Sequence, residues 1–117
     1  MKNFKELIVW QVGFEITQLC YGLVKLFPQE EKYGLVSQIT RAAYSIPSNI
    51  AEGSSRKSAR EYAHFLEIAL GSAFELETQL LLAQNLGFCN LNDTKSILCK
   101  VDQEQKMLIA FIKKLSL

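Results

Sequence analysis

The sequence has few of the residues from which metal, redox and catalytic sites are commonly built. It contains one histidine, His64, and three cysteines, Cys20, Cys89 and Cys99, which form no CxxC pair. Zinc sites and disulfide frameworks need paired or regularly spaced ligands. The serines form no GxSxG elbow, and the glycines form no GxxxxGK[ST] phosphate loop. We therefore expect no metal, no cofactor and no enzymatic activity, with His64 facing solvent or a partner.

Long apolar runs and an excess of one charge are also missing. No run approaches the roughly 20 residues that span a membrane, and the start of the chain has an amphipathic pattern unlike a signal peptide. We expect a cytoplasmic protein that does not enter a membrane. The 13 basic and 12 acidic residues give a net charge of +1, which does not predict a broad nucleic-acid-binding surface. An apolar fraction of 49% in 117 residues predicts one folded domain over residues 1–117.

Apolar residues recur at helical spacing in four segments. The expected helices cover residues 7–27, about 31–53, 58–87 and, starting at Asn90 or Asn92, up to 115. Pro28, Gly53 and Gly87 mark helix ends, and Ser58 with Glu61 has the pattern of a capping box. Four long helices with short connections predict an all-α, antiparallel up-down-up-down four-helix bundle.

Pro47 lies inside the second expected helix. Proline removes a backbone donor, and its ring clashes with the carbonyl group four residues earlier, here that of Ala43. The apolar spacing nevertheless continues from Ile39 to Ile50. We therefore expect one helix that is kinked at Pro47, with Ser45 and Ser48 available to pair the freed backbone groups.

The first and third helices have more apolar surface than a bundle usually covers. The first helix carries one stripe of Leu7, Trp10, Phe14, Thr17, Tyr21 and Val24, and an opposite stripe of Ile8, Val12, Ile16, Leu19, Leu23 and Leu26. The third carries a heptad from Tyr62 to Ala83 and a second stripe of Leu70, Phe74 and Leu81. A helix at the surface of a monomer usually buries one stripe. We therefore expect a homo-oligomer with an interface formed by Ile8, Val12, Ile16, Leu19, Leu70, Phe74 and Leu81, together with Asn49 and Glu52.

A polar cluster lies on one face of the second helix. Its members are Arg41, Ser45, Ser48, Asn49 and Glu52. One hypothesis is a network between subunits, in which Asn49 and Glu52 pair with Arg41 or Arg56. Another is a phosphate-binding edge, and a third is an ordinary solvated turn. The candidate nucleic-acid-binding residues are Arg41, Arg56, Lys57, Arg60, Lys113 and Lys114.

Two further expectations concern single residues. Gly71 lies in the middle of the third helix, where glycine costs about 1 kcal/mol relative to alanine. Close approach of another helix is the simplest compensation, and a ligand contact is the alternative. The acidic residues lie off the apolar stripes, so we expect none of them in the core.

The run from Ser45 to Gly53, SIPSNIAEG, resembles the signature of the bacterial four-helix-bundle proteins encoded in intervening sequences of 23S rRNA genes. Surrounding segments such as Leu7 to Gln11 also match, and the resemblance spans roughly residues 4–87. It implies a ring-like homopentamer. The chain is similar also to the accessory variability determinant proteins of diversity-generating retroelements, which are basic pentamers that bind nucleic acid and a reverse transcriptase. A net charge near zero departs from that branch.

These features favour a non-enzymatic homo-oligomeric scaffold, pentameric by resemblance. Its candidate partner is RNA, DNA or a nucleic-acid-associated protein, bound through a weak basic patch. The alternative is a purely structural or protein-binding module with no nucleic-acid role. An enzyme or small-ligand binder with a pocket between subunits lacks a supporting set of titratable residues.

Overall fold

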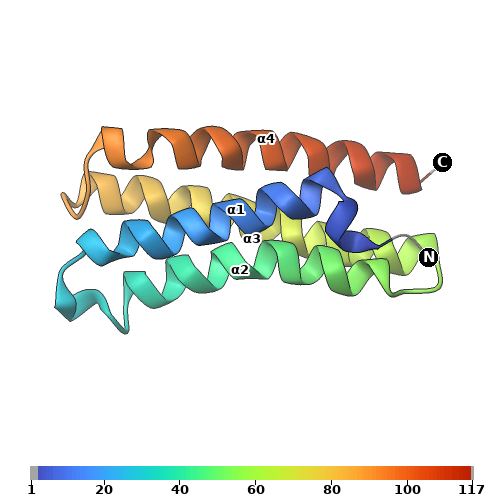
Figure 1. Ribbon diagram of the computed structural model, residues 1–117, viewed down its shortest axis with the longest axis horizontal. Helices are drawn as coiled ribbons and strands as arrows, with labels where there is room; N and C mark the ends of the chain where they lie inside the picture. Colours follow the sequence, from blue (N-terminus) through green and yellow to red (C-terminus); the bar gives the residue numbers. More distant parts are fainter. Residues whose placement is uncertain (1–2, 117) are drawn as a thin grey trace.

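Four long helices make up the structure, a computed structural model that describes residues 3–116 (Figure 1). The helices are α1 (Ile8–Leu23), α2 (Leu35–Ser54), α3 (Ala59–Asn85) and α4 (Leu91–Leu115). Three short 3₁₀ segments, η1 (Phe4–Glu6), η2 (Val24–Leu26) and η3 (Gln29–Glu31), precede α1 or connect it to α2. The predicted all-helical fold is confirmed, since residues 3–116 contain no strand.

The helices lie side by side in a bundle 44 Å long. α2 packs against α1 and α3, and α4 packs against α3 and α1. In Figure 1, α4 runs along the top, α2 along the bottom, and α1 and α3 between them. The α2–α3 connection lies at the same end of the bundle as both chain ends, and the other two connections lie at the opposite end (Figure 1). The edge between α1 and α2 is therefore opposite the edge between α3 and α4.

The core combines branched apolar side chains with alanines. Its largest fully buried apolar side chains are Ile16, Ile39, Ile46, Ile50, Leu66, Leu76, Leu80, Val101 and Leu108. Burying a side chain of this size contributes about 1.5–3 kcal/mol. Ala43 on α2 and Ala69 and Ala73 on α3 are also fully buried, which confirms the predicted heptad of α3. Small residues at these positions let the helix backbones approach closely.

The buried side of α1 runs between the two predicted stripes. It consists of Val9, Gly13, Ile16, Cys20 and Leu23. The expectation that Ile16 faces a neighbouring subunit is wrong, because its side chain has no exposed surface. Val12 and Leu19 are half-buried, and Ile8 is exposed. The two predicted stripes therefore lie on the flanks of α1, between its buried side and its polar strip.

α2 continues from Leu35 to Ser54 with Pro47 inside it, as one helix. Proline at this position has no N–H to donate to the carbonyl oxygen of Ala43. The Thr17 hydroxyl of α1 lies 3.0 Å from that oxygen and 2.9 Å from the carbonyl oxygen of Gly13. A side chain from a neighbouring helix therefore compensates the proline. Ser45, which we expected in this role, bonds instead to Ser72 of α3.

Glycines at the helix ends act in two different ways. Gly87 has a φ of +81°, and it ends α3 in a Schellman motif, with Phe88 N–H donating to the carbonyl of Ala83 at 3.0 Å. Gly53 is buried inside the last turn of α2, so its predicted role as a helix cap is wrong. A Cβ at Gly53 would lie 2.9 Å from the Cβ of Phe65, and glycine thus allows α2 and α3 to meet.

Side-chain caps begin α3 and α4. Ser58 accepts a hydrogen bond from the backbone N–H of Glu61 at 3.1 Å, and the Glu61 carboxylate accepts from the Ser58 hydroxyl. At α4, Asn90 and Asp93 form a complete capping box. Asn90 is thus the residue that opens α4. Gly71 has no heavy atom within 4 Å of a Cβ built on it, so nothing in the described chain explains this glycine.

Candidate interaction surfaces

The polar cluster of α2 forms its contacts within the chain. The Asn49 amide donates to the carbonyl oxygen of Ser45 at 2.8 Å and to its hydroxyl at 3.0 Å. The Ser45 hydroxyl lies 2.8 Å from the hydroxyl of Ser72 on α3. The bond between Ser45 and Ser72 connects α2 to α3 across their shared edge, and the Asn49 amide supports Ser45 from within α2. The hydrogen bonds of the Asn49 side chain are therefore explained within one chain, without the hypothesis that Asn49 sets the register between subunits.

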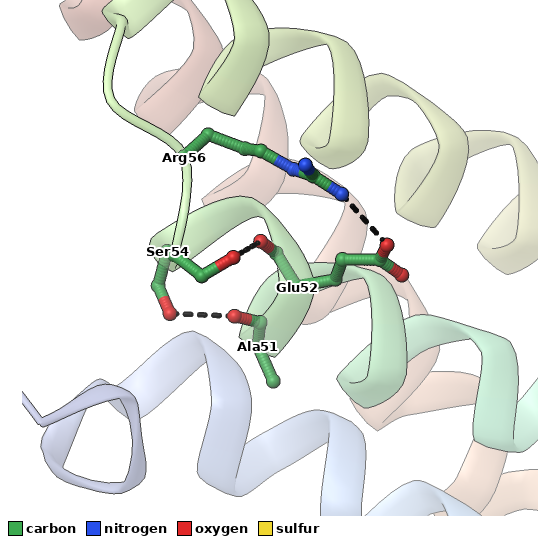
Figure 2. Close-up of polar contacts among 5 residues, drawn as sticks. Ala51, Glu52, Ser54 and Arg56 are labelled. Carbon is green, nitrogen blue, oxygen red and sulfur yellow. Dashed lines mark hydrogen bonds and ion pairs between the residues drawn. The ribbon is translucent and has the colours of Figure 1, made fainter.

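The end of α2 is held by contacts among its own last residues. The guanidinium of Arg56 is directed at the carboxylate of Glu52, 2.9 Å away, as Figure 2 shows. The predicted network placed this pairing between subunits, whereas Glu52 and Arg56 form an ion pair one turn apart within the same chain. Arg56 also lies over the ring of Phe65 on α3, 4.6 Å from its centroid. The hydroxyl of Ser54 donates to the carbonyl of Ala51 at 2.6 Å (Figure 2).

Most of the predicted basic residues gather at one end of the bundle. Lys57 and Arg60 are exposed in the α2–α3 connection and the first turn of α3, and Lys113 and Lys114 are exposed in the last turn of α4. Arg60 and Leu115 line the same depression, which brings the start of α3 beside the end of α4. None of these four basic side chains forms an ion pair with another residue between 3 and 116.

Arg41 does not belong to this basic end. Fifteen residues of continuous helix and turn separate it from Arg56, which corresponds to roughly 22 Å at 1.5 Å per residue. The predicted phosphate-binding edge is therefore wrong in including Arg41 beside Arg56, Lys57 and Arg60. Glu52 also neutralises part of the charge of Arg56, so the basic end consists chiefly of the other four cations.

An apolar groove runs along the edge between α1 and α2. Its volume is about 620 Å³, and no charged side chain lines it. The lining residues are Phe4, Trp10, Phe14, Thr17, Gln18, Tyr21, Tyr44, Pro47, Ser48 and Ala51. The Trp10 ring lies 5.4 Å from Phe4 and 5.0 Å from Phe14, centroid to centroid. The groove is thus built on the stripe of α1 that we did not assign to an interface.

A second apolar surface, the α3/α4 strip, lies on the opposite edge. We define it by Leu70, Phe74 and Leu81 on α3 and by Leu98 and Ile109 on α4. Phe74, Leu81 and Ile109 are about half exposed, and Leu70 and Leu98 pack partly against the core. The side chain of Gln105 on α4 reaches Ala73 and Glu77 on α3, which fixes the two helices relative to each other. The expectation that this stripe of α3 is uncovered within one chain is consistent with these exposures.

Glu104 is buried in the bundle, so the expectation that acidic residues avoid the core is wrong. Its side chain has no exposed surface, and neither carboxyl oxygen has a hydrogen-bond partner among residues 3–116. The carboxyl group faces Gly13 of α1, close to Ile46 and Pro47 of α2. Burial raises the pKa of Glu104 to about 8. The carboxyl group is therefore mainly neutral at pH 7, which reduces the cost of burying it.

The histidine and cysteine side chains do not cluster into a site within the described residues. His64 is exposed beside the ring of Phe65. Burial raises the pKa of the Cys20 thiol to about 12, so this thiol stays protonated. Within residues 3–116, no group of three metal-ligating side chains occurs. In the same range, no helix combines the length and apolarity needed to cross a membrane.

The arrangement is that of an all-helical protein with four long helices, and comparison with known proteins places it more narrowly. The chain belongs to the 23S rRNA-intervening sequence protein family, whose sequence profile matches residues 5–110. A crystal structure of a protein of unknown function from the S23 ribosomal protein family of Bacteroides thetaiotaomicron VPI-5482 is similar, with a TM-score of 0.84 and 29% identity. That match covers 91% of this chain and 99% of the other. Among curated proteins, none matches this chain.

Proposed function

We propose that the protein is a non-enzymatic interaction scaffold that works as a homo-oligomer. The groove between α1 and α2 carries this proposal. Its half-exposed aromatic side chains, Phe14 at 47% and Tyr44 at 46% exposure, form a continuous apolar surface without charge. Exposed apolar surfaces that gather several aromatic side chains often mark sites of protein–protein contact. Five copies is the number that the family resemblance of the run from Ser45 to Gly53 favours.

Co-expression of two differently tagged copies tests self-association directly. Purification through one tag should recover the second copy, and nuclease treatment of the lysate should leave the recovery unchanged. An unrelated helical protein carrying the second tag provides the control for nonspecific capture. Recovery of the first copy alone would overturn the proposed self-association. Recovery that disappears with nuclease would mean that nucleic acid, rather than protein contact, holds the copies together.

The same proposal gives nucleic acid a weak binding surface at the basic end. Lys57, Arg60, Lys113 and Lys114 are exposed there without ion-pair partners among the described residues. A single chain offers few phosphate contacts, but an oligomer presents the basic end several times and gains affinity through multivalency. Binding of this kind weakens steeply as salt concentration rises, because phosphate contacts release counterions.

Fluorescence anisotropy with a labelled RNA tests the basic end. We expect binding at low salt, and a variant with Lys57→Gln, Arg60→Gln and Lys114→Gln should bind more weakly with a smaller salt dependence. Lys25→Gln, Lys32→Gln and Lys95→Gln remove the same charge at the opposite end of the bundle and should have little effect. No binding by the wild type at low salt, or equal losses in both triple variants, would remove nucleic acid from the proposal.

A protein-binding module without a nucleic-acid role is the second candidate. The absence of charge in the lining of the groove favours it, because affinity for phosphate groups comes mainly from cationic side chains. In this case a nuclease-insensitive pulldown would recover another protein, and RNA binding would be absent at all salt concentrations.

A further inference from the structure

Each copy carries two different uncovered apolar surfaces on opposite edges of the bundle. The groove lies between α1 and α2, and the α3/α4 strip lies on the far side. The groove is concave and lined by aromatic rings. The strip consists of separate side chains that project from two helices, with Phe74 at 49% and Ile109 at 48% exposure. Concave and projecting apolar surfaces of this kind complement each other.

The remaining two edges of the bundle are bridged within the chain. Across the edge between α2 and α3, Ser45 bonds to Ser72 and Arg56 lies over Phe65. Across the edge between α1 and α4, the Lys100 ammonium lies 2.8 Å from the Glu15 carboxylate. These two edges are thus bridged by polar contacts within the chain. The α1/α4 edge also exposes Ile8, in a second pocket that Phe111 and Lys114 of α4 line.

We propose that the α3/α4 strip of one copy occupies the α1/α2 groove of the next copy. The inference rests on the proposed homo-oligomer and specifies which of its surfaces meet. A groove without charged lining offers no ionic partner to a phosphate or a charged peptide, whereas it can cover the apolar side chains of Phe74, Leu81 and Ile109. The net charge of +1 per chain gives the copies little mutual repulsion.

A contact between two different surfaces has a geometric consequence. Each copy offers its strip to one neighbour and its groove to another, so the interface is heterologous. Repetition of a heterologous contact produces a ring when the rotation closes. Aromatic side chains in the groove, especially Phe14 and Tyr44, are expected to contribute most of the binding free energy, because desolvated aromatic anchors dominate protein interfaces.

Two double variants test this arrangement. In the groove variant, Phe14→Glu and Tyr44→Glu place a charge on each helix of the groove. In the strip variant, Phe74→Glu and Ile109→Glu do the same on α3 and α4. A control variant with Gln38→Glu and Gln103→Glu adds equal charge at exposed polar positions on α2 and α4. Circular dichroism verifies that each variant retains its helices, and light scattering after size-exclusion chromatography measures its mass.

We expect the wild type and the control variant to assemble and each double variant to be a monomer. An equimolar mixture of the groove and strip variants retains one intact pair of surfaces, so it should form a dimer of one copy of each and nothing larger. A monomeric wild type would refute the proposed oligomer itself. Assembly of the wild type with no dimer in the mixture, or continued self-assembly of either double variant, would refute only the pairing of strip with groove.

Milder substitutions cover the case in which a double variant loses its helices. Tyr44→Gln and Ile109→Gln each introduce a polar group at a half-exposed position without adding charge. Each should weaken assembly at least several-fold. This loss of affinity is measured from the dependence of the mass on protein concentration. An unchanged affinity in both single variants would overturn the inference as well.

Discussion

The carboxyl group of Glu104 fills the space that a side chain at Gly13 would need. A Cβ at Gly13 would lie 2.8 Å from Oε2 of Glu104, 3.1 Å from Cγ2 of Ile46 and 3.4 Å from Cδ of Pro47. Three helices therefore meet at a point where α1 has only backbone. The fully buried carboxyl group of Glu104 fits because its neighbour, Gly13, has no side chain. A larger residue at position 13 would meet Glu104.

Gly13→Ala should destabilise the fold. The added methyl group meets atoms on two other helices, and such overpacking costs about 1–3 kcal/mol. Gly22→Ala in the same helix is the matched control, because no heavy atom lies within 4 Å of its Cβ position. The control should gain up to about 1 kcal/mol from helix propensity. Urea unfolding measures both, and equal effects of the two substitutions would contradict the close contact at Gly13.

Stability should decrease as pH rises, because of Glu104. Burial raises the pKa of this group in the folded protein to about 8, above the ordinary value of 4.5 for a glutamate. Between these two pH values the unfolded chain has lost the proton that the folded chain retains. The free energy of unfolding therefore falls from about pH 4.5 to about pH 8, by at most about 1.4 kcal/mol per pH unit.

The substitution Glu104→Gln isolates this effect. The variant cannot titrate at this position, so it should remove the Glu104 contribution to the pH dependence and exceed the wild type in stability at pH 8.5. Glu67→Gln, at an exposed position on α3, is the control and should retain the wild-type slope. Two ion pairs of α4, Lys100 with Glu15 and Lys106 with Asp102, lie at the surface and are unchanged in both variants. The same slope in Glu104→Gln as in the wild type would contradict the assignment.

Thr17→Val should cost about 1–3 kcal/mol, because it leaves the carbonyl group of Ala43 without a donor. The loss should be smaller when Pro47 is also replaced by alanine, since alanine restores the backbone N–H at position 47. A double-mutant cycle measured by chemical unfolding gives the coupling free energy between the two residues. Equal costs of Thr17→Val in both backgrounds would show that the hydroxyl does not compensate the proline.

Leu70→Lys combined with Phe74→Lys should split the oligomer and leave helicity mostly intact. Both residues belong to the α3/α4 strip, where Phe74 is half exposed and Leu70 only partly covered. Light scattering and circular dichroism measure the two properties on the same sample. Loss of helicity together with loss of assembly would mean that the stripe belongs to the core of a single chain.

The four helices follow from the sequence because periodic apolar positions, short connections and the terminal Gly87 all indicate the same elements. The core line of α1 was harder to identify, since Gly13 and Cys20 interrupt the apolar pattern while aromatic residues on the flank strengthen a different stripe. Glu104 was missed although a signal exists. The spacing of Ile97, Val101 and Leu108 requires a further core position between the last two, and the structure buries both Glu104 and Gln105 there.

The partners of individual polar groups could not be derived from spacing along one helix. Thr17 and Ala43 are 26 residues apart, and Ser45 and Ser72 are 27 residues apart. Their contacts depend on how far each helix is displaced along its neighbour, which the periodicity of a single helix does not specify. The basic end was predicted in part, because Arg56, Lys57 and Arg60 are adjacent in sequence, whereas the placement of Arg41 required the length of α2.

The mass of the wild-type protein in solution tests the central claim most directly. Size-exclusion chromatography with light scattering, run over a range of concentrations, gives this mass independently of shape. The proposed assembly predicts a mass near five times the 13.3 kDa of one chain. A mass of 13.3 kDa at every concentration would contradict self-association, and the groove and the strip would then be unpartnered in the isolated protein.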